Sequence, residues 1–146
     1  MGKLILILGG LWLAACAERR YVADPGIREA AGEDCALRFR VSGNCLALHW
    51  DELPTETAYG RFILRIYDLA DEDGFPKLVD LYSDPVVDLE MPAMNHDSPP
   101  VTVEKLEDGT YRVSNVFFIM AGEWEIRILV TDGGGATDEA VIPFTF

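Results

Sequence analysis

Two methionines and a histidine lie within six residues, at positions 91–96, where the sequence reads Met-Pro-Ala-Met-Asn-His. Thioether sulfur and neutral imidazole are soft to borderline ligands, and together they suit Cu(I) better than magnesium or calcium. Another methionine, Met120, begins a turn that precedes a strongly alternating segment. We therefore predict a Cu(I) site that holds the metal reversibly for transfer and is formed by Met91, Met94, His96 and Met120.

The same side chains have a plainer interpretation, which the sequence leaves open. Methionine commonly fills irregular gaps in hydrophobic cores, and His96 would then cap a turn or face solvent. Residues 91 and 93 share a face in an extended segment, so Met91 and Met94 would point apart. Pro92 interrupts the strand pattern, and a loop at this point can turn both sulfurs inward.

The segments around residues 91–96 alternate between apolar and polar residues, which is typical of half-buried strands. Turn signals rich in Gly, Pro, Asn and Asp separate them. This pattern predicts an all-β fold, an immunoglobulin-like antiparallel β-sandwich of about eight strands, with an up-and-down barrel as the alternative. Neighbouring loops cluster at the ends of a sandwich, which would bring Met120 close to residues 91–96. The expected strands are residues 37–41, 46–50, 62–66, 78–82, 86–89, 101–106, 111–118, 124–130 and 140–146. In the strand at 111–118, Tyr111, Val113 and Phe117 are expected on one face.

The N-terminus has the features of an export signal. Lys3 precedes an apolar run over residues 4–13, and small residues follow before a cysteine. The sequence Leu-Ala-Ala-Cys at 13–16 resembles the lipobox of bacterial lipoproteins. This resemblance implies a signal peptide at 1–15, a lipidated Cys16, a tether at 16–34 and a domain at 35–146. Ala17 favours the outer membrane, facing the periplasm. An ordinary secretory signal with a chance cysteine is the alternative.

Net charge and cysteine content indicate which partners and which cross-links to expect. The formal net charge is −13, and removal of Lys3 with the signal would make it one unit more negative. Such a chain repels nucleic acid, so we expect no DNA or RNA partner. Cys35 and Cys45 are expected to form a disulfide in an oxidising compartment, although a regular hairpin at 42–44 would not place them opposite each other. A thiol pair for copper is the alternative.

Residues 89–128 resemble the YtkA-like domain family of exported bacterial proteins. The resemblance lies in Met-Pro-Ala-Met-Asn-His at 91–96, Asp-Gly-Thr-Tyr at 108–111 and Met-Ala-Gly-Glu-Trp-Glu-Ile at 120–126. FixH-like proteins and, more distantly, CopC-like copper carriers are similar to this family, which implies an envelope protein connected with copper handling. One departure is that a lipidated Cys16 would leave no free amino terminus for a Cu(II) site.

No catalytic motif is visible in the sequence. It holds no Gly-x-Ser-x-Gly, no phosphate-binding loop and no His-Glu-x-x-His, so we do not expect an enzyme. The leading hypothesis is a lipid-anchored periplasmic binding protein for Cu(I). The alternative is a structural or protein-interaction module of the cell envelope, in which residues 91–100 or an exposed strand edge contact a protein partner.

Overall fold

The computed structural model of the chain describes residues 37–68 and 77–146. The predicted signal peptide, the lipidated Cys16, the tether and Cys35 all lie outside these residues. The described residues form nine strands. None of them lies in a helix long and apolar enough to cross a membrane.

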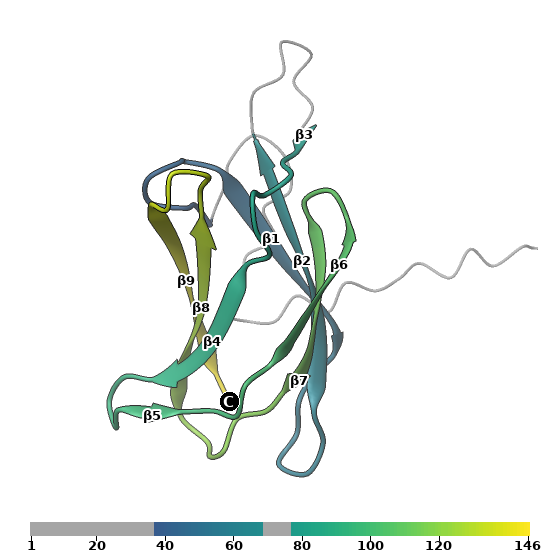
Figure 1. Cartoon of the computed structure of the whole chain (residues 1–146). Helices are drawn as coiled ribbons and strands as arrows, with labels where there is room; N and C mark the ends of the chain where they lie inside the picture. The colour runs from purple at the N-terminus through teal and green to yellow at the C-terminus, as the bar shows by residue number, and fades with distance from the viewer. Residues whose placement is uncertain (1–36, 69–76) are drawn as a thin grey trace, which may run out of the picture.

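The strands form two antiparallel sheets that pack against each other (Figure 1). In the first sheet the order is β1-β2-β7-β6, and the short β3 pairs with β2; in the second it is β5-β4-β8-β9. This arrangement confirms the predicted all-β sandwich. The bounds are β1 Cys45–Glu52, β2 Gly60–Asp68, β3 Lys77–Leu78, β4 Val86–Met91, β5 His96–Asp97, β6 Thr102–Glu107, β7 Thr110–Val116, β8 Glu123–Thr131 and β9 Thr137–Thr145.

The core fills the space between the two sheets. Phe62, Leu64 and Ile66 of β2 are fully buried, as the alternation of that strand predicts. The second sheet contributes Trp124 and Ile126 of β8, whose side chains are also fully buried. Since successive side chains of a strand point to opposite faces, the polar residues between them face solvent. Each apolar side chain of this size contributes about 1.5–3 kcal/mol when fully buried.

Residues 37–41 were predicted to form a regular strand, and this prediction is wrong. Only Arg38 makes a bridge, to Cys45, and Val41 is 80% exposed instead of facing the core. The carboxylate of Asp138 in β9 accepts hydrogen bonds from the amides of Val41 and Ser42, at 2.9 and 2.6 Å. These bonds hold a turn over residues 40–42 against the second sheet. Pairing toward β1 ends at Phe39, whose amide donates to the Asn44 carbonyl at 2.9 Å.

The predicted inward position of Phe117 is also wrong, because the register of β7 changes before it. Asn115 has a left-handed backbone with φ of 62°. Gly60 of β2 pairs with Val116 of β7, and Phe62 pairs with Val113. Two steps along β2 therefore correspond to three steps along β7, so β7 holds one extra residue. A bulge of this kind reverses the faces of the residues beyond it. Val116 and Phe118 are therefore buried, and Phe117 is only half-buried.

Residues 78–82 were expected to form one strand, but in the structure only Lys77–Leu78 pairs, as β3. Pro85 directly precedes β4, as expected of a proline at a strand start. Residues between β3 and β4 are not in a strand, and β4 begins at Val86 and ends in the methionine-histidine stretch at Met91.

Candidate metal site at the β4–β5 hairpin

The methionine-histidine stretch forms a hairpin between β4 and β5. Met91 is the last residue of β4, and it pairs across the hairpin with His96, the first residue of β5. The Met94 amide donates a hydrogen bond to the Met91 carbonyl at 3.1 Å. Asn95 closes the connection in a left-handed conformation, with φ of 51°, which asparagine tolerates better than most residues. The stretch is therefore a defined turn.

The pairing of Met91 with His96 places their side chains on one face of the second sheet. Directly opposite residues in an antiparallel pair carry β-carbons about 4.5–5.5 Å apart on the same side. Met91 is 3% exposed and belongs to the core, so His96 projects from the inner face. Because β5 lies at the edge of its sheet, the imidazole remains accessible to solvent.

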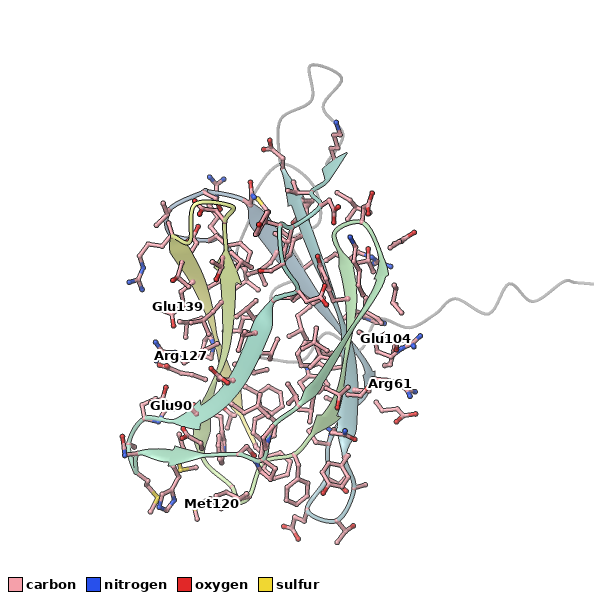
Figure 2. All side chains as sticks on the ribbon, viewed as in Figure 1. Arg61, Glu90, Glu104, Met120, Arg127 and Glu139 are labelled. Atoms are coloured by element: carbon pink, nitrogen blue, oxygen red, sulfur yellow. The ribbon has the colours of Figure 1, made fainter. Side chains whose placement is uncertain are left out.

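The turn that carries Met120 lies over the tip of Met91. A β-carbon added to Gly122 would lie 2.8 Å from Cε and 3.9 Å from Sδ of Met91. The turn is firmly held, because Trp124 donates its indole N–H to the Met120 carbonyl at 3.0 Å. Gly122 also exchanges two backbone hydrogen bonds with Phe146. Figure 2 shows Met120 at the end of the sandwich where the β4–β5 hairpin lies.

The four predicted ligands thus occupy one end of the molecule but differ in burial. Met91 lies in the core, as the core-filling interpretation expects. Met94 and Met120 are 53% and 37% exposed, so neither fills the core, and His96 is exposed as well. Met94 lies at the tip of the hairpin, where no ladder constrains its side chain. The end therefore offers two accessible thioethers and an imidazole above a buried thioether.

Harder ligands do not gather here. Within residues 37–68 and 77–146, no three His, Cys, Asp or Glu side chains lie close enough together to hold a metal ion. A metal at this end would depend on methionine sulfur, which favours Cu(I) over oxygen-seeking cations.

Sequence reasoning missed an ion cluster on the outer face of the second sheet. Arg127 lies 3.0 Å from a carboxylate oxygen of Glu90, 3.5 Å from Glu125 and 2.5 Å from Glu139. The hydrogen bond to Glu139 is the main reason why the pKa of Arg127 is raised. The alternation of residues 124–130 indicates that Glu125 and Arg127 face outward together. The approach of Glu90 from β4 and Glu139 from β9 depends on the order of the strands in the sheet, which the sequence does not state.

Of the two cysteines in the predicted disulfide, the structure describes only Cys45. Cys45 is fully buried at the start of β1, whereas Cys35 lies outside the described residues. The pairing of Cys35 with Cys45 stays a prediction.

Residues 77–129 match the family model described as YtkA-like. The match runs from β3 into β8 and includes all four predicted ligands, so the predicted resemblance is confirmed over this part of the chain. No curated protein and no solved structure matches the chain.

Proposed function

We propose that this chain, YtkA-like over residues 77–129, is a non-catalytic binding protein of the cell envelope that holds Cu(I) reversibly. The accessible ligands are Met94, His96 and Met120, and Met91 lies beneath them as a fourth sulfur. Cu(I) prefers soft sulfur and accepts imidazole. A site at the exposed end of a rigid sandwich would allow the metal to pass to a partner.

The cross-strand pairing of Met91 with His96 supports this proposal most directly. It directs the imidazole to the face on which the Met91 side chain lies, and the Met120 turn packs on the methyl group of that thioether. Two segments that are distant in sequence therefore converge on one thioether. The anchoring of the turn by Trp124 means that little ordering would be required when the metal binds.

The proposal is tested by titrating the purified full-length chain with Cu(I) against a colorimetric Cu(I) chelator under anaerobic conditions. We expect one equivalent of Cu(I) to be withdrawn from the chelator. His96→Gln, Met94→Leu and Met120→Leu should each weaken binding at least about tenfold, or 1.4 kcal/mol. Leucine keeps the size of methionine but removes the sulfur.

The chain supplies its own control for the histidine variant. His49 is the only other histidine and lies in β1, in the other sheet, so His49→Gln should leave Cu(I) affinity unchanged. If the unaltered chain withdraws no Cu(I), or if His49→Gln and His96→Gln weaken binding equally, the metal proposal is wrong.

Met91→Leu distinguishes a ligand from a core residue. If Met91 contributes its sulfur, this variant should lose Cu(I) affinity while its unfolding free energy changes by less than about 1.5 kcal/mol. If affinity is retained, the site consists of the three accessible ligands alone.

We further propose that Cys16 carries a lipid that anchors the chain to a membrane, on the periplasmic face of the outer membrane. The support is the sequence Leu-Ala-Ala-Cys after an apolar run. Membrane fractionation tests it, because Cys16→Ser should move the chain from the membrane to the soluble fraction. An unchanged distribution in Cys16→Ser would exclude the anchor.

A further inference from the structure

The edge of β4 is open over its first half. β4 pairs with β8 along Val86–Glu90 on one side, but on the other side β5 pairs only with Glu90 and Met91. The last contact in this direction is the Ser98 amide, which donates to the Leu89 carbonyl at 2.9 Å. Backbone groups two residues apart in a strand point the same way. The N–H and C=O of Val87 therefore point toward the open edge.

Two prolines explain why the edge stays open. If the β4–β5 ladder continued in register beyond Glu90 and Asp97, Pro100 would lie opposite Val87. Proline has no backbone N–H, so Pro100 cannot donate to the Val87 carbonyl. Pro99 and Pro100 instead lead the chain away toward β6 in the other sheet. Figure 1 shows the chain leaving β5 and turning into β6 of the other sheet.

A groove of about 620 Å³ follows this edge. Its apolar wall consists of Val87 and Leu89 from β4 together with Val101, just before β6, and Val103 within it. Val101 and Val103 are only partly buried against the core. The groove thus combines free backbone groups with apolar side chains, which is the combination used when a sheet edge accepts an added strand.

The polar side of the groove is strongly acidic. It carries the carboxylates of Asp88, Glu90, Asp97 and Glu139 against one guanidinium, that of Arg127, which already contacts Glu90 and Glu139. A second copy of this chain would bring the same negative charge to the edge and be repelled. A basic segment would be attracted instead.

We propose that the β4 edge binds an extended segment of a partner protein in which apolar and basic residues alternate. The segment adds a strand beside Val87, and its backbone pairs with the free N–H and C=O. Its apolar side chains face Val87 and Val101, while its lysines or arginines lie beside Asp88 on the outer face. This surface is separate from the proposed metal ligands and does not depend on them.

The test uses the ¹⁵N-labelled full-length chain and a capped synthetic peptide of alternating valine and lysine, about six residues long, the usual length of a strand. Backbone amide shifts on titration should concentrate at residues 86–89 and 101–103. A peptide with the same sequence but N-methylated backbone amides keeps the charge and loses the donors, so it should not bind. Shifts elsewhere, no binding by the first peptide, or equal binding by both would overturn the proposal.

A charge reversal provides the matched variant. Asp88→Lys changes an exposed residue of the groove and should weaken peptide binding about threefold or more, the scale of a surface ion pair reversed. Glu56→Lys makes the same change at an exposed position in the β1–β2 connection and should leave binding unaltered. Equal weakening by both variants, or concentration-dependent dimerisation of the free chain, would rule out the basic partner.

Discussion

Gly122 approaches Met91 so closely that a β-carbon on the glycine would lie 2.8 Å from the methionine methyl group. The backbone of Gly122 also has φ of +150°, a conformation that side chains disfavour. Both facts explain why a glycine stands in the Met120 turn. This contact places the Met91 methyl group against the Met120 turn.

Gly122→Ala should therefore lower the unfolding free energy by about 1–3 kcal/mol through backbone strain and should push the Met91 side chain aside. Urea denaturation measures the first effect. Gly43→Ala is the control, because Gly43 also has positive φ but has no atom within 4 Å of an added β-carbon. A larger loss of stability at Gly122 than at Gly43 would reflect its φ of +150° and the Met91 contact together, and equal losses would show that the contact is soft.

The bulge at Asn115 gives a second prediction. Asn115 has φ of 62°, and a β-branched residue is a genuine outlier in that region. Asn115→Val should destabilise the fold by about 1–2 kcal/mol. Asn115→Gly relieves the strain but loses the 3.0 Å hydrogen bond from the amide to the Thr102 hydroxyl, so it should stay near the parent. The thermal unfolding temperatures of Asn115→Val and Asn115→Gly measure the difference in stability. A Val variant as stable as the Gly variant would contradict the strain argument.

The features that were predicted correctly are those encoded locally. The alternation of β2 and β8 follows from consecutive residues, and so does the sandwich, because turn signals lie beside each strand. The errors arise where distant residues intervene. The turn that exposes Val41 is bound by Asp138, nearly a hundred positions away, and Phe117 is shifted by a bulge whose register is defined against β2. Likewise, nothing in residues 91–96 reveals that the Met120 turn covers Met91.

The carboxylate of Asp138 is expected to make stability depend on pH. Burial acts to raise its pKa, but hydrogen bonds from the Ser42 and Val41 amides outweigh burial and lower the pKa overall. A carboxyl with a lower pKa in the folded state stabilises it fully above the unfolded-state value, near 4, and this contribution is lost as the pH falls through the folded-state pKa.

Asp138→Asn should cost about 1–3 kcal/mol at pH 7, because an amide cannot accept all the hydrogen bonds of the carboxylate. The difference from the parent should shrink below about pH 4, where the parent carboxyl also becomes protonated. Urea denaturation at pH 7, 5 and 3 measures it. Asp84→Asn, at an exposed position, is the control and should show little effect at any pH. A gap that is constant with pH would refute the assigned role.

The predicted disulfide leads to a final test. The Leu46 amide donates to the Leu37 carbonyl at 3.0 Å, and Arg38 pairs with Cys45. Cys35 precedes Arg38 by three residues in the sequence, a chain length that permits a Cys35–Cys45 bridge.

We expect the thiols of Cys35 and Cys45 in the purified chain to resist alkylation in denaturant until a reductant is added, which mass spectrometry detects directly. Cys35→Ser should lower the unfolding free energy by about 2–3 kcal/mol, the usual effect of opening a short loop, and reductant should then have no further effect on stability. Cys45→Ser should cost more, since it also places a hydroxyl at a fully buried position. Alkylation of both cysteines without reductant would instead favour the thiol pair.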